Sequence, residues 1–222
     1  MRLSKSALDK FLDCPRCFYL KYKHKLDQPD MISSKAWKGI ERVALCHYEK
    51  YRGLKLTPPN LVGLVPEGSI PYQGDRISLP HLRYWGKGLR FMVDGVEVST
   101  ALDDMLQRPG PDGKTVYSVI DLKSKSKETD EESTRKLYQT QADVFDLAAN
   151  VNEYPTDGTV FFDYWSPLEV QDSAVGVTIQ AWKSQVISLK ADHERCKKLV
   201  LAAAACIDGP MPEPNFKMVI GK

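Results

Sequence analysis

The sequence has no long uninterrupted hydrophobic run. Its 222 residues are 42% hydrophobic, yet no stretch approaches the roughly 20 apolar residues that a membrane-spanning helix needs. The first residues also lack the continuous apolar segment of a signal peptide. We therefore expect a soluble, cytoplasmic protein that does not interact with membranes. The length and composition suffice for one substantial core, and so we predict a single domain over residues 1–222.

An excess of charge of one sign is also absent, because the formal net charge is only +2. Any nucleic-acid-binding surface must therefore be local. Residues 1–25 combine seven Lys or Arg with several aromatic residues, a pattern that can hold phosphates and stack bases. The candidate contacts are Lys5, Lys10, Arg16, Tyr19 and Lys21. The alternative is an amphipathic helical pair with aromatic side chains in the core and solvated lysines.

Cysteine is scarce and poorly placed for a metal site. Cys14 and Cys17 form a CPRC motif, but Cys196 and Cys206 are ten residues apart. A zinc site would need two more ligands at close spacing. We expect reduced thiols, partly packed in the core.

The segment YSVIDLK, residues 117–123, is the most informative stretch. Side chains alternate along a strand, so Asp121 and Lys123 are expected on one face, with Leu122 pointing into the core. A carboxylate beside an ammonium suits metal-assisted phosphodiester hydrolysis. The tripeptide also arises by chance, as in Asp112-Gly113-Lys114, which we interpret as a solvated loop.

A second acidic site lies upstream in FMVDGVEVSTALDDML, residues 91–106. The Pro/Gly-rich segment 108–113 predicts a hairpin that brings Asp103 beside Asp121. Two carboxylates and the backbone carbonyl of Leu122 make an oxygen-rich site suited to Mg²⁺ or Mn²⁺. The alternative is that Asp103 and Asp104 simply end a strand at the surface.

Helical periodicity follows in STRKLYQTQADVFDLAANV, where Tyr138, Gln141, Phe145 and Ala148 share one face. Gln141 is the polar exception on this face, and its alternative is a surface amide. The remaining pattern predicts helices over 1–51, capped at Ser4 or Ser6 and restarted at Pro15, a loop-rich insertion over 52–90, and an α/β core with a closing helix over 91–222.

The order of these segments resembles the PD-(D/E)XK nuclease superfamily, in particular its RecB-like branch, which includes CRISPR-associated exonucleases. LSKSALDKFLDCPRCFYLKY is similar to the branch's opening signature, and STALDDML resembles its metal-binding Asp segment, with Thr100 where glycine is usual. VIDLKSK resembles the strand with the catalytic acid and lysine. YQTQADVF resembles the Gln-x-x-x-Tyr helix, with Phe145 in place of tyrosine.

The resemblance implies a restriction-endonuclease-like mixed central β-sheet flanked by helices, with an N-terminal helical segment. It implies catalytic roles for Asp103, Asp121, Lys123 and Gln141, with Mg²⁺ or Mn²⁺ as cofactor. We expect a prokaryotic or viral DNA nuclease of repair, recombination or CRISPR-type processing. Its DNA would be single-stranded or the ends of duplexes, and it would have a protein partner in a repair or CRISPR adaptation complex.

Two features depart from this family. Many members carry a histidine ligand four residues after a glycine on an early helix, but Val43 holds that position after Gly39. His47, one turn further along, is a candidate metal ligand; the alternative is a lone surface histidine. Glu41 is a weaker candidate, which we expect to face elsewhere. Some relatives bind an iron–sulfur cluster through three carboxyl-terminal cysteines, but PMPEPNFKMVIGK contains none, and we expect no cluster.

These departures leave a different class open, a catalytically impaired nuclease-fold module that binds DNA or a partner. A binding module has no chemical need for two converging carboxylates, which repel each other unless a cation lies between them. A third alternative is an unrelated α/β protein with coincidental motif matches.

Overall fold

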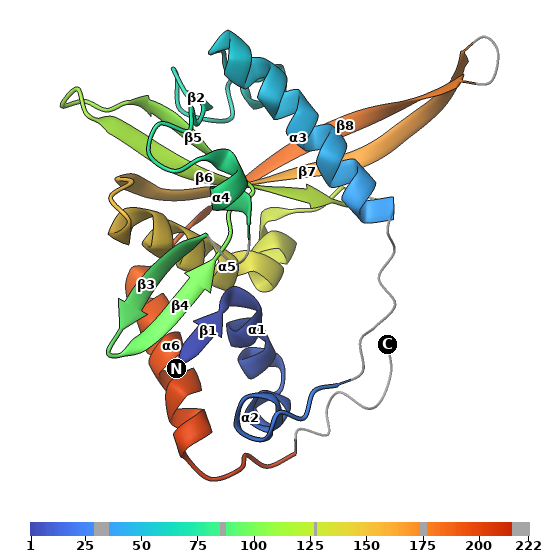
Figure 1. The fold of residues 1–222 in the computed structure, drawn as a ribbon. Coiled ribbons are helices and arrows are strands. Elements are labelled where there is room, and N and C mark those ends of the chain that lie inside the picture. Colours follow the sequence, from blue (N-terminus) through green and yellow to red (C-terminus); the bar gives the residue numbers. More distant parts are fainter. Residues whose placement is uncertain (29–35, 85–87, 127, 174–176, 215–222) are drawn as a thin grey trace.

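The computed structural model describes residues 1–28, 36–84, 88–126, 128–173 and 177–214 (Figure 1). In these ranges the helices are α1 (Lys5–Asp13), α2 (Pro15–His24), α3 (Ala36–Leu54), the 3₁₀ turn η1 (Pro59–Leu61), α4 (Leu79–Arg83), α5 (Glu131–Val151) and α6 (His193–Asp208). The strands are β1 (Arg2–Ser4), β2 (Ile70–Pro71), β3 (Leu89–Val93), β4 (Val96–Thr100), β5 (Asp104–Pro109), β6 (Thr115–Ser124), β7 (Thr156–Ser173) and β8 (Val177–Lys190).

The strands form two mixed sheets, which confirms the predicted α/β class. The larger sheet has the order β2-β5-β6-β7-β8, and only its β6–β7 pair is parallel among the described strands. The smaller sheet has the order β1-β4-β3, with β1 parallel to β4. None of the helices in the described ranges is long and apolar enough to cross a membrane.

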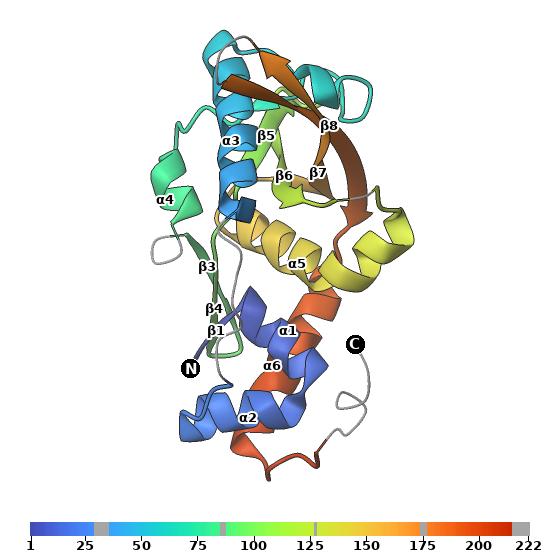
Figure 2. The same ribbon diagram turned by 90° about the vertical axis from the view of Figure 1, so that its right-hand side faces the viewer.

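Helix α5 lies between the two sheets, while α3 covers the other face of the larger sheet (Figures 1 and 2). Side chains of β6 alternate between these two environments. Val119 belongs to the core on the α5 side, and Ile120 and Leu122 belong to the core on the α3 side. Strand β6 is therefore buried on both faces, which explains its nearly continuous apolar sequence.

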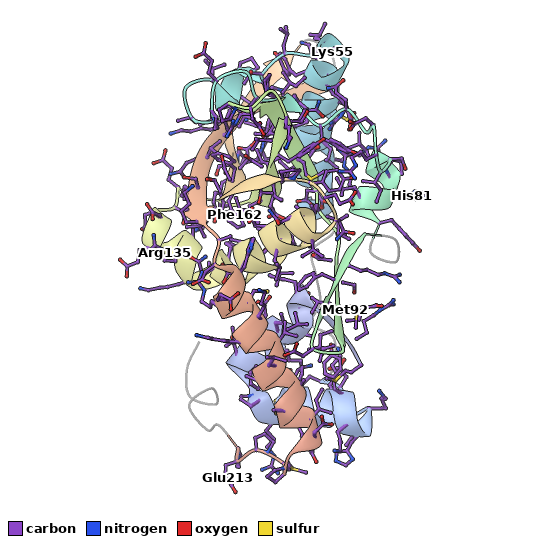
Figure 3. The ribbon with its side chains drawn as sticks, turned by 90° about the vertical axis from the view of Figure 1, so that its left-hand side faces the viewer. Lys55, His81, Met92, Arg135, Phe162 and Glu213 are labelled. Atoms are coloured by element: carbon purple, nitrogen blue, oxygen red, sulfur yellow. The ribbon has the colours of Figure 1, made fainter. Side chains whose placement is uncertain are left out.

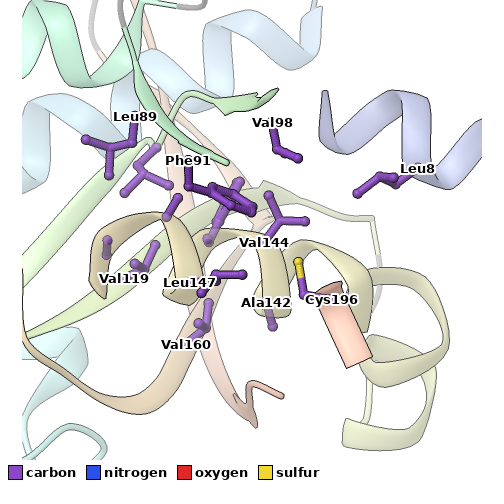
Figure 4. Packing of buried hydrophobic residues seen from close by; sticks show 14 of the residues in the cluster. Leu8, Leu89, Phe91, Val98, Val119, Ala142, Val144, Leu147, Val160 and Cys196 are labelled. Carbon is purple, nitrogen blue, oxygen red and sulfur yellow. The ribbon is translucent and has the colours of Figure 1, made fainter. Parts of the chain in front are cut away.

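One hydrophobic core connects both sheets through α5. It includes Val98 of β4, Val119 of β6, Val144 of α5 and Cys196 of α6, which are labelled in Figure 4. Phe162 of β7, labelled near the centre of Figure 3, stacks on Tyr138 of α5 with ring centroids 5.5 Å apart. The position of α5 relative to β6 is thus fixed by apolar packing on both sides of the helix.

The predicted hairpin between the two acidic segments is confirmed. Strands β5 and β6 pair in antiparallel register from Asp104–Ile120 to Pro109–Thr115. Gly113 in the turn has φ +76°, a left-handed conformation that glycine adopts without steric cost. The hairpin register places Asp103 just beyond the last pair, next to the acidic end of β6.

The run 91–106 does not form one continuous strand but contributes to β3, β4 and β5. Asp94 and Gly95 both have positive φ and form a tight turn between β3 and β4 in the smaller sheet. Asp-Gly between two apolar runs is a strong hairpin signal, and it outweighs the apparent continuity. The chain then leaves the smaller sheet after Thr100 and enters the larger one at Asp104, so Asp103 lies where the sheets meet.

The other predicted elements are present with shifted boundaries. Ser4 caps α1 by accepting a hydrogen bond from the Ala7 N–H, and Pro15 begins α2. Residues 52–90 are mostly loop, as predicted, but they also contain η1, β2 and α4. Residues 156–173 and 177–190 form a long antiparallel ribbon, and α6 closes the chain against α5.

Candidate active site

A cleft of about 420 Å³ opens where the two sheets meet. One part of its lining comes from Ser4–Ser6 at the start of α1 and from Ser99–Ala101 at the end of β4. The other part comes from α3, α4, β5, β6 and α5 and carries Glu41, Arg83, Asp103, Asp121, Leu122, Lys123, Gln141 and Phe145. All four residues predicted to be catalytic therefore line one cavity.

Asp121 and Lys123 lie on the same face of β6, as strand alternation predicts. Their side chains form an ion pair, and Asp121 is only 3% exposed. Leu122 between them is buried on the opposite face in the α3-side core. The sequence pattern thus gives both the pairing of the charged groups and their orientation.

Gln141 joins this pair from α5. Its Nε2 donates a hydrogen bond to Asp121 Oδ1 at 2.8 Å, and Lys123 Nζ donates to its Oε1 at 3.3 Å. Gln141 is 5% exposed, so the alternative of a surface amide is wrong. Tyr138, one turn earlier on α5, places its ring 4.6 Å from Lys123 Nζ, which holds the ammonium from another side through a cation–π contact.

Asp103 completes the group from the start of β5. Its Oδ2 accepts a hydrogen bond from the Leu122 N–H at 2.9 Å. In a strand the N–H and C=O of one residue point to the same edge, so the Leu122 carbonyl is directed to the edge on which Asp103 lies. Asp103 directly precedes β5, whose first residue forms the pair Asp104–Ile120 with β6.

The two carboxylates of the group lie in a buried position and repel each other. Burial and then the charge of Asp121 raise the pKa of Asp103 well above its usual value, although the Leu122 N–H and Lys123 act in the opposite direction. Burial lowers the pKa of Lys123, but the charge and hydrogen bond of Asp121 outweigh it, so the net shift is upward. Lys123 is therefore a protonated donor in this state.

Glu41 corrects one prediction. We expected it to face elsewhere, yet it lines the cleft and also an adjoining cavity of about 120 Å³ beside Leu122 and Lys123. Its negative charge contributes to the raised pKa of Asp103. The residue was misplaced because the register of α3 relative to the sheet depends on packing, which the helical period alone does not determine.

His47 is not brought to the cleft. Its Nε2 is 2.9 Å from Asn60 Oδ1, and its ring packs against Tyr51 and Trp165. In this environment His47 packs α3 against its neighbours and does not lie where it could bind a metal together with Asp103 and Asp121. Val43, at the position expected for the family histidine, is 44% exposed.

The neighbouring aspartate, Asp104, has a structural role. It is fully buried and forms ion pairs with Arg52 and Arg83. Arg83 also donates from Nε to the Asp103 backbone carbonyl at 2.7 Å and lines the cleft. The alternative in which Asp103 and Asp104 end a strand at the surface is thus wrong. No pattern in the sequence predicted that Arg83, which is distant along the chain, lies at the cleft.

The predicted N-terminal contact residues divide into two groups. Lys5 lines the cleft and pairs with Asp9 at 2.7 Å. Lys10 and Lys21 both pair with Asp27, and these two cations hold the pKa of Asp27 well below its usual value.

Tyr19 is 7% exposed and packed in the protein, so the prediction that it stacks on a base is wrong. Arg16 is partly exposed at the start of α2, outside the cleft lining. The alternative of an amphipathic helical pair with core aromatics is what α1 and α2 form, because Phe11, Phe18 and Tyr22 also pack on the main core.

The donor set of the cleft fits a hard divalent cation. Asp103, Asp121, the Leu122 carbonyl and nearby Glu41 supply oxygen atoms, which Mg²⁺ and Mn²⁺ prefer. Burial and, after it, the charge of Asp121 raise the pKa of Asp103, and a cation would relieve the repulsion between the two carboxylates. Across the described ranges no group of three or more His, Cys, Asp or Glu side chains is already arranged around a common metal position.

No protein-family model matches the chain, and no curated protein matches it significantly. The interpretation of the cleft therefore rests on its own geometry and on the motifs of the sequence.

Proposed function

We propose that the protein is a metal-dependent nuclease that hydrolyses phosphodiester bonds of DNA. The observation that carries this proposal is the convergence of Asp103, Asp121, Lys123 and Gln141 in one open cleft, from three elements that are separate in sequence. Two acidic groups, a lysine and an amide are the side chains that a metal-assisted hydrolysis requires. The mixed sheet that carries them is compatible with a restriction-endonuclease-like core.

Asp103, Asp121 and the Leu122 carbonyl would hold Mg²⁺ or Mn²⁺, with Glu41 as a further carboxylate. When bound, such an ion polarises a phosphate oxygen and lowers the pKa of water. Lys123, which lies beside Asp121 in the cleft, would position the attacking water or a phosphate oxygen by hydrogen bonding. Gln141 fixes Lys123 and Asp121 relative to each other through its two side-chain hydrogen bonds.

The open shape of the cleft supports a polymeric substrate. The lining of the cleft also includes Ser6, Ser99 and the cation Lys5, and residues of these types bind phosphate and sugar in nucleic-acid complexes. We propose single-stranded DNA or duplex ends as substrate. The proposed setting is DNA repair, recombination or CRISPR-type processing, with a protein partner and in the cytoplasm.

One observation favours a second candidate, a nuclease-fold module that binds DNA or a partner without cutting. Val43 leaves α3 without a histidine at the expected position, and His47 does not compensate. Glu41 at the cleft offers a carboxylate from the same helix, and on this ground we favour the active nuclease.

The test is cleavage of end-labelled single- and double-stranded DNA by the wild type and by Asp121→Ala, each with Mg²⁺, Mn²⁺ or a chelator. We expect cleavage by the wild type with metal and none by the variant or in chelator. Intact DNA in every sample, with binding still measurable, would support the non-cutting module. Equal cleavage by both proteins would refute the assignment of the site.

A further inference from the structure

The start of α2 holds two thiols in close contact, away from the cleft residues. Cys14 Sγ and Cys17 Sγ are 2.7 Å apart, and both side chains are partly exposed. A disulfide bond is about 2.05 Å long. The two sulfur atoms are therefore within about 0.7 Å of bonding distance.

The local backbone explains this contact. Cys14 is the N-cap of α2, and its Sγ accepts a hydrogen bond from the Cys17 N–H at 3.2 Å. An N-cap side chain and the residue three positions later meet in the same way in a capping box. Pro15 occupies the first helical position, where its missing N–H is not needed. Sulfur here takes the place of the usual capping oxygen.

The electrostatic surroundings suit thiol chemistry. The Cys14 sulfur lies at the N-terminal end of a helix, where negative charge is stabilised. The contact with Cys14 and then burial raise the pKa of the Cys17 thiol, while Lys10 and Arg16 act in the opposite direction. The Gln28 amide also donates to Cys17 Sγ at 3.3 Å. We assign the first attack to Cys14, whose sulfur lies at the helix N-terminus, and the second attack to Cys17.

We propose that Cys14 and Cys17 form a reversible intramolecular disulfide, with a small-molecule disulfide such as oxidised glutathione as the oxidant. The Cys14 thiolate attacks one sulfur of the oxidant, forms a mixed disulfide and releases one thiolate. Cys17 loses its proton and attacks Cys14 Sγ, which releases the second thiolate. Two electrons pass to the oxidant, which leaves as two thiols, and the two cysteines each lose one proton.

The bond would restrain the backbone where α1 ends and α2 begins. Cys14 also ends α1, where its N–H donates to the Lys10 carbonyl at 2.9 Å, and α1 begins at the cleft with Ser4–Ser6. The third nearby sulfur is Cys206 of α6, which lies 3.9 Å from the Pro15 carbonyl oxygen. Cys206 contacts the backbone of the motif, whereas Cys14 and Cys17 contact each other, so we assign the bond to these two.

Tryptic digestion can detect this disulfide directly, because the two cysteines fall on different peptides. Trypsin cleaves after Lys10, Arg16 and Lys21, which places Cys14 on peptide 11–16 and Cys17 on peptide 17–21. The folded full-length protein is equilibrated in graded mixtures of reduced and oxidised glutathione, alkylated and digested. We expect the two peptides to appear joined by a disulfide under oxidising conditions and to separate again on reduction.

Variants make the result specific. Cys17→Ser should abolish the joined peptide and leave one glutathione on Cys14, while Cys46→Ser, which removes the exposed thiol of α3, should leave the redox midpoint unchanged. Circular dichroism of each sample checks that the protein stays folded. Separate glutathione adducts on Cys14 and Cys17 of the wild type would overturn the proposal, as would a bond to the peptide with Cys206 or a bond that forms only after unfolding.

Discussion

Asp121 and Asp163 lie one register position apart on the parallel pair of β6 and β7, yet their surroundings differ completely. Asp121 pairs with Phe162, and Asp163 pairs with Leu122, so the two carboxylates project from opposite faces of the sheet. Asp163 is fully buried and accepts hydrogen bonds from Tyr48, Asn60, Trp165 and Ser184. Asp121 opens toward the cleft and has a lysine and a second carboxylate as neighbours.

The difference separates a carboxylate that is fully satisfied by hydrogen bonds from one that faces a cleft beside a second carboxylate. Four donors satisfy Asp163 and tie α3, η1 and β8 to β7, so it holds together the face that α3 covers. The pair of Asp103 and Asp121 is incompletely compensated, because like charges lie close together in a buried position. Such an arrangement costs stability and is retained where it serves a cation or a reaction.

The largest expected effect is that of Asp103→Asn on cleavage. The substitution removes a carboxylate from the proposed metal site, and we expect cleavage to fall to background.

The same substitution should stabilise the metal-free protein at neutral pH. The raised pKa of Asp103 means that ionisation in the folded state is disfavoured, so the wild type loses stability as pH rises from the usual carboxyl pKa through the raised one. Asn does not ionise and lacks this loss. Urea unfolding at several pH values in chelator, beside end-labelled DNA cleavage, measures both effects. Lower stability of the variant at neutral pH would contradict the repulsion argument.

Lys123→Ala should reduce cleavage on the order of 10²- to 10⁴-fold, the usual range for a group that positions or transfers a proton. Lys123→Arg is the matched control, because it keeps the charge but changes the donor geometry, and we expect it to remain impaired. The measurement is the single-turnover cleavage rate at saturating metal. A rate for Lys123→Ala within a few-fold of the wild type would remove the lysine from the mechanism.

Asp163→Asn should affect stability and leave the chemistry of the cleft intact. An amide has only one acceptor oxygen, so at least one of the four donors would be left unpaired at a cost of roughly 1–3 kcal/mol. For a chain of this length each kcal/mol lowers the melting temperature by about 2–4 °C. Thermal unfolding measures the loss, and cleavage at a temperature where the variant is fully folded is the control. Abolished cleavage in the folded variant would break the distinction between the two carboxylates.

Gln141→Ala should lower the cleavage rate by roughly tenfold, since one hydrogen bond to a charged group contributes about 1.5 kcal/mol and 1.4 kcal/mol corresponds to a factor of ten. Gln141→Glu is the informative companion, because it adds a negative charge next to Asp121 and should be worse than Ala in chelator-treated stability measurements. A rate unchanged by Gln141→Ala would show that Asp121 and Lys123 are held without it.

His47→Gln should have the smallest effect on cleavage. The side chain contacts Asn60, Tyr51 and Trp165 outside the cleft, and substitutions away from a site change free energies by about 0.5 kcal/mol, or about twofold in rate. Rates are compared per folded molecule, with stability from thermal unfolding. A loss of more than tenfold at unchanged metal affinity would restore His47 to the candidate site.

The local parts of the site were readable from the sequence. Strand alternation gave the shared face of Asp121 and Lys123, turn chemistry gave the hairpin that brings Asp103 near, and helical periodicity put Gln141 among buried residues. Each of these is a short-range relation, fixed by backbone geometry over a few residues. The Asp94-Gly95 turn is an exception, because the Asp-Gly pair is a turn signal in the sequence but no turn was predicted there.

The distant parts of the site depended on tertiary packing. The sequence by itself determined the α/β class, most elements and the charged pair of Asp121 and Lys123 on β6, because these follow from periodicity and turn residues. Only the folded structure placed Glu41 and Arg83 at the cleft, moved His47 away and buried Tyr19, because the rotation and offset of α1, α2 and α3 against the sheets are set by side-chain packing. The same packing decided which carboxylate, Asp121 or Asp163, faces the open cleft.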